Sequence, residues 1–453
     1  MVANGSAGEG GATERRIQPR TLKGFNDYLP AQAARRQLIR ERLRAAFERW
    51  GYQPLETPSV EYADVLLGRY GAEAEKLIYQ FEDHGGRDVA LRYDQTVPFA
   101  RVVAQYPHLP RPFRRYQLDR VWRGENTARG REREFTQCDV DIAGTASPIA
   151  DAETLAVAAE GYHAIGFARV RLQVNDRTIF DQLGLNKAEV IAVDKMDKIG
   201  AGGVVRELMA LGRGEAAATD LLTRLQGAAP TPRLREVMTA ALDLGLPPEE
   251  LHYEPLLARG LEYYTSTILE VRSPDYAAGS LGGGGRYDTL IRRFTGRDVP
   301  AVGFSFGLER VAEALEAVGA FADFQSGPEV VAIALGAGQL AWTGQVAARL
   351  REAGVRVALS IEPRAQLGRQ LEAAAKLGAH YALLLGEDEL AAQLVTLRDL
   401  DSRQQVTLDV ASLLARLTHQ QGHHATATAR SVDERVGAGG HAGRGAVNDG
   451  HPN

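Results

Sequence analysis

The apolar residues near the start of the folded chain recur at helical spacing. Over residues 31–50 they share one face of a segment otherwise rich in arginine and glutamate, which predicts an amphipathic helix ended by Gly51. Residues 148–166 predict a second helix. Residues 176–250 combine alanine, leucine, glutamate and arginine at helical spacing with glycine and proline breaks, so we interpret them as a helical insertion.

Alternating patterns predict strands between these helices. Residues 113–143 contain two strand-like stretches around a polar, charged loop, which predicts an antiparallel hairpin. Residues 169–175, 251–257 and 264–271 also have strand patterns, the last with a two-residue period. Residues 52–62, interrupted by two prolines, predict an extended segment.

The pattern changes near residue 327. From there a buried strand, a helix, a strand, a helix and two further strands follow in turn, which predicts a small, mostly parallel sheet with covering helices. We therefore expect one domain at residues 19–326 and a second at 327–418. The ends of the chain, residues 1–18 and 419–453, lack apolar periodicity, so we expect disordered tails.

Composition excludes several classes of protein. The chain has 453 residues, 44% hydrophobic and 25% charged, as is ordinary for a globular protein. The net charge of -5 predicts no general affinity for nucleic acid, so RNA binding would need local patches. The single cysteine, Cys138, excludes an intramolecular disulfide framework and a cysteine-based zinc site.

The same data suggest a location. We expect a reducing, cytoplasmic setting, because the first residues lack the apolar core of a secretory signal and no run of 18 apolar residues could cross a membrane. We also expect no metal site in the tail, since its histidines are irregularly spaced and lack acidic partners: His423, His424, His441 and His451.

Asp94 and Thr96 form the first candidate site. We expect them on a strand, where residues two apart share a face, and there a carboxylate and a hydroxyl could hold a substrate ammonium group. The alternative is an exposed strand end without a ligand.

The loop of the predicted hairpin is the most basic part of the chain. Residues 111–133 contain eight arginines against three acidic residues. Guanidinium groups there could bind phosphate, and Phe135 could stack on a base. Gln137 and Asp141 would share the face of Phe135, with Thr136 and Cys138 on the opposite face. The alternative is a solvated, charged loop.

Three further motifs follow in order. Residues 259–265, RGLEYYT, place a guanidinium beside two phenol hydroxyls, Tyr263 and Tyr264. Residues 281–290, LGGGGRYDTL, contain four glycines where the backbone could approach a ligand closely, although such a run is more often a flexible turn. Residues 301–311, AVGFSFGLERV, predict a strand that leads into a helix.

Taken together, these motifs resemble those of histidyl-tRNA synthetases, which are class II aminoacyl-tRNA synthetases, from residue 19 to about 415. The resemblance implies an α+β catalytic core, with an antiparallel sheet flanked by helices and a helical insertion, plus a C-terminal α/β anticodon-binding domain. It implies ATP-dependent ligation of L-histidine to tRNA(His) through a histidyl-adenylate, with Mg²⁺ bridging phosphates, in a homodimer formed near Pro58. The alternative is a non-charging paralogue that regulates ATP phosphoribosyltransferase.

The resemblance also implies a role for individual residues. Arg123 and Arg259 would be the catalytic cations. ATP would be bound by Arg123, Glu125, Arg131, Phe135 and Arg310. Histidine would be bound by Asp94, Gln95, Thr96, Arg123, Gln137, Asp141, Arg259, Tyr263 and Tyr264.

Overall fold

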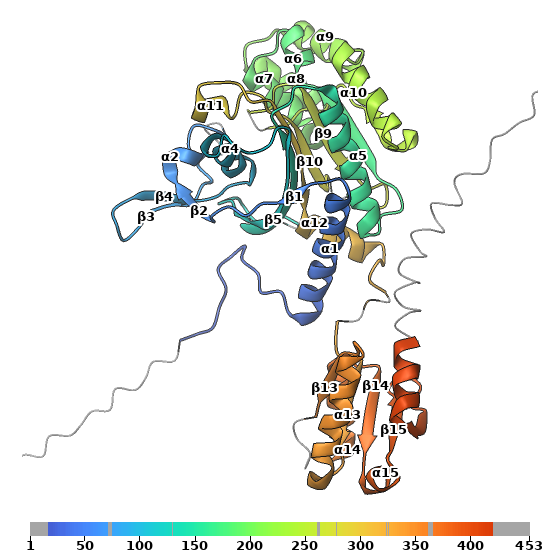
Figure 1. The fold of residues 1–453 in the computed structure, drawn as a ribbon. Coiled ribbons are helices and arrows are strands. Elements are labelled where there is room, and N and C mark those ends of the chain that lie inside the picture. Colours follow the sequence, from blue (N-terminus) through green and yellow to red (C-terminus); the bar gives the residue numbers. More distant parts are fainter. Residues whose placement is uncertain are drawn as a thin grey trace, which may run out of the picture.

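The structure, a computed structural model, describes residues 17–70, 75–128, 130–260, 263–277, 279–322, 324, 326–360 and 366–419. Most of the two predicted tails therefore lies outside the described residues. The described residues form three sheets, and the two larger ones have their own helices (Figure 1). Among the described residues, no helix combines the length and the apolar character that crossing a membrane requires.

The larger sheet has eight strands in the order β1-β5-β6-β11-β10-β9-β7-β8. Neighbouring strands are antiparallel except at the two edges, where β1 pairs with β5 and β7 with β8 in parallel. The predicted hairpin is confirmed as β5 and β6, which pair along their whole length. The strands are β1 (Gln53–Pro54), β5 (Phe113–Trp122), β6 (Glu134–Ala143), β7 (Arg171–Asp176), β8 (Leu251–Tyr253), β9 (Thr267–Arg272), β10 (Gly282–Arg286) and β11 (Ala301–Gly307).

Helices cover the back face of this sheet. The predicted first two helices are confirmed as α1 (Pro30–Arg49) and α5 (Pro148–Ile165), and α10 (Pro232–Asp243) and α12 (Leu308–Ala317) lie with them. The helix α5 is buried along most of its length, with Pro148 in its first turn and the side chain of Ser147 accepting a hydrogen bond from the backbone N–H of Ile149. Because these helices cover the back face, only the front face of the large sheet is left for a ligand.

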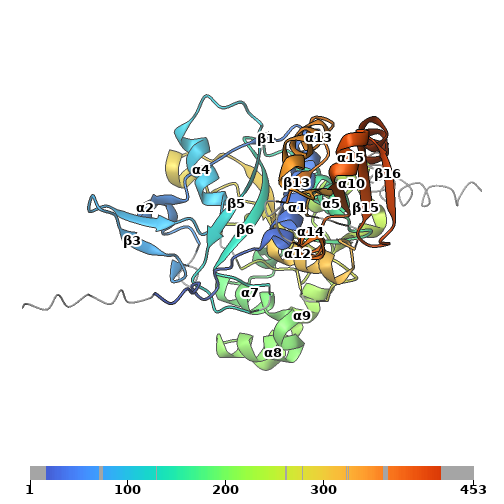
Figure 2. The ribbon, with the colours of Figure 1, turned by 90° about the horizontal axis from the view of Figure 1, so that it is seen from below.

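The front of the sheet carries smaller elements (Figure 2). A three-stranded sheet lies there in the order β2-β4-β3, beside two short helices. Its strands are β2 (Val60–Tyr62), β3 (Gln80–Glu82) and β4 (Asp88–Leu91), and the helices are α2 (Ala63–Leu66) and α4 (Thr96–Gln105). The predicted helical insertion is confirmed as α6 (Thr178–Gln182), α7 (Lys187–Asp194), α8 (Met196–Ala210), α9 (Glu215–Gln226) and α10, and the turn η1 (Pro248–Glu250) follows. The short helix α11 (Arg292–Thr295) packs near α4.

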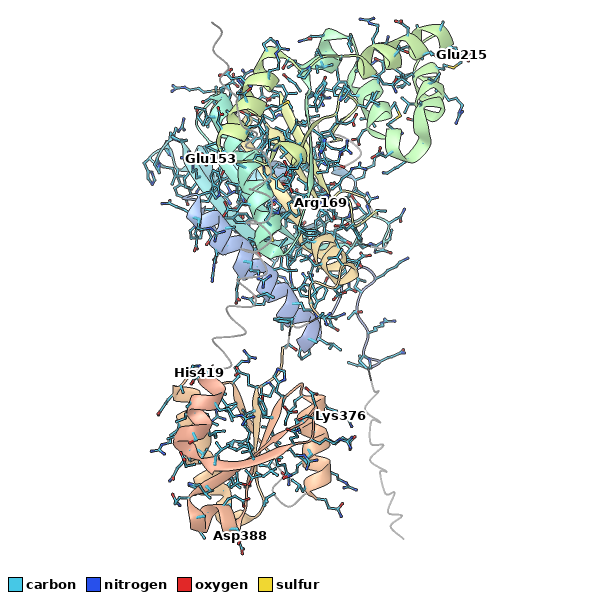
Figure 3. The ribbon with its side chains drawn as sticks, turned by 90° about the vertical axis from the view of Figure 1, so that its right-hand side faces the viewer. Glu153, Arg169, Glu215, Lys376, Asp388 and His419 are labelled. Carbon is cyan, nitrogen blue, oxygen red and sulfur yellow. The ribbon has the colours of Figure 1, made fainter. Side chains whose placement is uncertain are left out.

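The C-terminal sheet has five strands in the order β13-β12-β14-β15-β16. Its helices are α13, α14, α15 and a further helix at residues 410–419, and Lys376, Asp388 and His419 mark this part in Figure 3. The predicted mostly parallel sheet is wrong, because β15 and β16 form an antiparallel hairpin and only two of the four strand pairs are parallel. The elements are β12 (Val330–Ala334), η2 (Ala337–Gln339), α13 (Leu340–Glu352), β13 (Val357–Leu359), α14 (Leu367–Lys376), β14 (Tyr381–Leu385), α15 (Glu387–Ala392), β15 (Leu394–Asp399) and β16 (Gln405–Asp409).

Candidate active site

The strand β6 presents alternate residues to the two faces of the large sheet, as its sequence predicts. Cys138 is fully buried in the helix-side core, and the backbone N–H of Thr136 donates to Glu309 on α12. Gln137 and Asp141 therefore face the front of the sheet. The front of β6 is thus lined with polar groups that are almost entirely buried.

The four-glycine run is a strand in the middle of the sheet, not a turn. As β10, it pairs with β9 on one side and β11 on the other. A Cβ atom added to Gly283 would lie 2.6 Å from Arg259 Cζ, and one added to Gly285 would lie 2.9 Å from the Tyr264 ring. The glycines are needed because these two side chains lie directly on the backbone of the sheet.

Arg259 lies in the loop before β9. Its Nη1 donates to Glu270 Oε2 at 3.0 Å, and its side chain is 23% exposed. The Asp194 carboxylate of the insertion also faces this arginine; burial raises the pKa of Asp194, and the positive charge of Arg259 opposes that rise. Arg259 is therefore held on the glycine floor by acidic groups from two different elements.

Asp94 does not lie on a strand with Thr96, so that expectation was wrong. The strand β4 ends at Leu91, and α4 begins at Thr96. The cause is local: Asp94 Oδ1 accepts from the backbone N–H of Val97 at 3.1 Å, which satisfies a free donor of the first helical turn.

Asp94 is instead bound by tyrosines. Tyr70 donates its hydroxyl to Asp94 Oδ1 at 2.9 Å, and Tyr263 donates to Oδ2 at 3.3 Å. Burial raises the pKa of Asp94. The Tyr263 hydroxyl also lies against the half-buried Thr96 side chain, and the Tyr263 and Tyr264 rings are 4.8 Å apart. The structure thus brings together both predicted halves of the histidine site, although the tyrosines lie in a loop.

Gln95 is completely buried beneath this group. Its Nε2 donates to the backbone carbonyls of Asp119 at 2.9 Å and Gln137 at 3.1 Å. Its amide nitrogen therefore ties the start of α4 to the strands β5 and β6.

Asp141 lies on the same front face of the sheet and is also buried. Tyr287 donates its hydroxyl to Asp141 Oδ1, and Arg115 Nη2 lies 2.6 Å from Oδ2. Burial raises the pKa of Asp141 to about 7, against the lowering effect of Arg115. The carboxylate is held in place by one phenol and one buried guanidinium.

Arg123 follows the end of β5 and lies between two aromatic rings. Its guanidinium carbon is 4.3 Å from the centre of the Tyr93 ring and 5.0 Å from that of Phe135, and its Nε donates to the Tyr93 carbonyl at 3.1 Å. Two rings and one hydrogen bond fix the plane of this guanidinium, as recognition of a phosphate requires.

The predicted nucleotide residues beyond Arg123 surround the hairpin loop. Glu125 forms an ion pair with Arg131. Arg310, on α12, donates from Nη1 to the Ser280 carbonyl at 2.9 Å and from Nε to the Gly130 carbonyl at 3.2 Å. Arg310 therefore joins the hairpin loop to the segment that enters the glycine strand. Within the described residues, no hydrogen bond or ion pair joins these three side chains to Asp94 or Asp141.

Several residues of this site were not singled out from the sequence. Asp139 and Ser305 could have been found from the two-residue alternation of β6 and β11. Tyr70, Tyr93 and Arg115 have no local signal, because only the tertiary fold brings them to the site. The missed residues are Tyr70, Tyr93, Arg115, Asp139 and Ser305.

Comparison with known protein families gives two matches that together cover most of the chain. The family described as histidyl-tRNA synthetase matches residues 24–229 and 201–311. The family described as anticodon binding domain matches residues 329–420. The first matched range contains the eight-stranded and three-stranded sheets, and the second contains the five-stranded sheet.

Individual proteins agree with this assignment. The histidine–tRNA ligase of Aeropyrum pernix is 37% identical, over 84% of this chain and 93% of the relative, and that of Gloeobacter violaceus is 36% identical, over 86% and 97%. Among solved structures, histidyl-tRNA synthetase from Nostoc sp. PCC 7120 is similar with a TM-score of 0.78 and 30% identity, and the match covers 89% of this chain and 100% of that one.

Proposed function

The chain belongs to the histidyl-tRNA synthetase family, and we propose that it ligates L-histidine to tRNA(His) in two steps, with ATP as the source of energy. In the first step a carboxylate oxygen of histidine attacks the α-phosphorus of ATP, and pyrophosphate leaves. In the second, a hydroxyl of the terminal adenosine of the tRNA attacks the carbonyl carbon of the adenylate, and AMP leaves.

One observation carries the proposal: Arg259 lies on a glycine floor next to a buried group of tyrosines and carboxylates. The guanidinium suits the negative charge of the α-phosphate and of the substrate carboxylate, and such charge neutralisation is the main need of this reaction. Arg123, held between two rings, would bind the same phosphate from the other end. These two arginines are the catalytic cations of the proposal.

The amino acid would lie among the acidic and phenolic groups. Asp94 and Thr96 would hold its ammonium group, Gln137 would contact its amine and carboxylate, and Tyr263, Tyr264 and Asp141 would contact the imidazole. A pocket of paired polar groups rejects other amino acids, since each wrong side chain leaves a buried donor or acceptor without a partner. Gln95 would contribute by fixing the backbone beneath them.

The nucleotide would lie along the hairpin. Phe135 and Glu125 would position adenine, Arg131 would reach the terminal phosphates, and Arg310 would pack over the base. Mg²⁺, when bound, neutralises phosphate charge. The described residues contain no group of three or more metal-ligating side chains, so the ion would be held mainly by the phosphates of ATP.

The partners of the chain follow from the same proposal. The anticodon-binding domain would bind tRNA(His). A homodimer would form around Pro58, which lines a cavity of about 790 Å³ where Val60 and Tyr62 are exposed. The cytoplasm, where ATP and tRNA are available, is the compartment that we propose.

Histidine-dependent exchange of pyrophosphate into ATP tests the first step. We expect exchange with histidine and none with the other amino acids. Arg259→Ala should lose most of this exchange while its thermal unfolding stays close to that of the unchanged protein, and normal exchange by the folded variant would remove Arg259 from the mechanism. No exchange by folded, unchanged protein would favour the non-charging regulatory paralogue instead.

A further inference from the structure

A third carboxylate, Asp139, lies between Gln137 and Asp141 on the front face of β6. It is only 2% exposed, and the proposed mechanism gives it no role. An acidic side chain is rarely buried to this extent without a partner or a ligand. The groups around Asp139 therefore show which partner its carboxylate still needs.

The neighbours of Asp139 leave one of its oxygens free. Ser305, its cross-strand partner on β11, lies in hydrogen-bonding contact with the carboxylate and accepts from Gln137 Nε2 at 3.1 Å. Arg115 Nη2 is 3.9 Å from Asp139 Oδ2 but 2.6 Å from Asp141 Oδ2. The guanidinium therefore compensates Asp141 much more closely than Asp139.

Three buried acceptors on this face of β6 have no hydrogen-bond partner among the described residues, and one of them, Asp141 Oδ2, is compensated by its ion pair with Arg115. The other two are Asp139 Oδ1 and Gln137 Oε1. Gln137 is itself only 8% exposed, so both acceptors are more than nine-tenths buried. Because buried acceptors are nearly always satisfied, this pair indicates a ligand that brings N–H donors.

The charged groups on this face of the sheet indicate what kind of donor the ligand brings. Asp94, Asp139 and Asp141 gather there, and Arg115 is the cation buried among them, with Arg123 at the edge. A cation with several N–H groups would satisfy both free acceptors and reduce the excess negative charge, whereas a neutral donor would do only the former.

We propose that Asp139 Oδ1 binds the α-ammonium group of the histidine substrate together with Gln137, Asp94 and Thr96, which makes Asp139 a further specificity-determining residue. This inference rests on the proposed function. Asp139 thereby distinguishes a free amino acid from the same molecule without its amine, and it places the α-carboxylate on the side of Arg123 and Arg259.

Three ligands separate this role from a structural one. L-histidine has the ammonium and the carboxylate, histamine keeps only the ammonium, and imidazole-4-propionate keeps only the carboxylate. Their affinities for the full-length protein and for Asp139→Asn would be measured by calorimetry. Asparagine has almost the same shape and can still accept from Ser305, so the change removes mainly the charge.

We expect Asp139→Asn to weaken histidine and histamine by about 10- to 100-fold, the usual effect of losing a hydrogen bond to a charged group. Imidazole-4-propionate should bind as well as before, or more tightly, because repulsion of its carboxylate falls. Equal losses for all three ligands, or no loss for any, would overturn the inference. If the asparagine variant does not fold, the affinities of Asp139→Ser for the three ligands replace it and are interpreted in the same way.

Asp298→Asn is the matched control, since Asp298 is exposed and pairs only with Arg292 at the surface in the described structure. It makes the same change of charge and should alter none of the three affinities. If the unchanged protein does not bind histidine at all, the proposed function fails together with this inference. If it binds histidine and Asp139→Asn binds it equally well, only the role of Asp139 fails.

Discussion

Arg259 lies across the backbone of Gly283 in the middle of the large sheet. A Cβ atom at Gly283 would stand 2.6 Å from Arg259 Cζ, so any other residue there would push the guanidinium away from the floor. The glycine and the arginine are 24 residues apart in the chain but form one unit. Because Gly283 has no side chain, the guanidinium of Arg259 can lie on the backbone there.

The first prediction tests this unit. Gly283→Ala should lower the rate of histidine-dependent pyrophosphate exchange by about 100-fold, since a misplacement of about 1 Å at a reacting group can have that effect. Its free energy of unfolding should fall by less than about 1 kcal/mol, because the atoms displaced are the end of a flexible side chain. Exchange kinetics and urea unfolding measure the two effects.

Gly284→Ala is the matched control. Its added Cβ would lie 2.7 Å from Phe304 Cα, and that backbone of β11 cannot move aside. We expect the opposite balance, a loss of about 1–3 kcal/mol in the free energy of unfolding. Full activity of a stable Gly283→Ala protein would show that the position of Arg259 does not matter for the reaction.

The sequence predicted the part of this site that depends on local periodicity. Alternation along β6 was sufficient to place Gln137 and Asp141 together and Cys138 on the opposite face, because a strand with one face in the core has only one possible register. The same rule misplaced Asp94 and Thr96. A helix starts there, and no period reveals the hydrogen bond from Val97 that caps it.

The remaining errors also have physical causes. Four consecutive glycines predict a turn when the backbone is considered alone. They form a strand here, and the side chains of Arg259 and Tyr264 that lie on it explain why the residues are glycines. Tyr70 and Arg115 were missed because each reaches its carboxylate from a distant segment. In the C-terminal sheet, alternation identified β15 but could not give the direction of its pairing.

The second prediction concerns Tyr70, whose hydroxyl donates to Asp94 Oδ1 at 2.9 Å. Tyr70→Phe removes one of the groups that orient this carboxylate, so the KM for histidine should rise by about tenfold and the free energy of unfolding should fall by about 1 kcal/mol. The KM for ATP should stay unchanged. Tyr106→Phe, at a residue 42% exposed, is the control and should change neither quantity. An unaltered KM for histidine would mean that Tyr263 alone orients Asp94.

The third prediction concerns the plane of the Arg123 guanidinium. Lysine keeps the charge but loses both the stacking between Tyr93 and Phe135 and the two-pronged geometry for phosphate. Arg123→Lys should therefore lower kcat/KM for ATP by about 10- to 100-fold, the effect of about 1.4–2.7 kcal/mol. Arg120→Lys, near the end of β5 and 56% exposed, should have little effect. Equal activity of both variants would reduce the role of Arg123 to that of a point charge.

The fourth prediction follows from the buried carboxyls without substrate. Burial raises the pKa of Asp139 to about 6 and that of Asp141 to about 7, against an ordinary value of 3.8, with Arg115 opposing the rise. Because these raised values belong to the folded protein, it binds more protons than the unfolded chain between pH 4 and 7. Their contribution to stability is therefore complete below pH 4 and is lost as the pH rises toward 7, by up to about 1.4 kcal/mol per pH unit for each group.

Urea unfolding at pH 5, 6 and 7 would measure this effect by comparing the unchanged protein with Asp139→Asn. Asp94, Arg115, Arg123, Ser305 and Tyr287 face the pair in both proteins. The variant loses the titration of Asp139 and also the raising effect of Asp139 on the pKa of Asp141, and both changes act in the same direction. We expect the stability of the variant relative to the unchanged protein to increase with pH over this range. Saturating histidine should reverse the trend for the unchanged protein, since the ammonium group favours the ionised carboxylates. A difference in stability that does not depend on pH would show that Asp139 is already ionised below pH 5 in the folded protein.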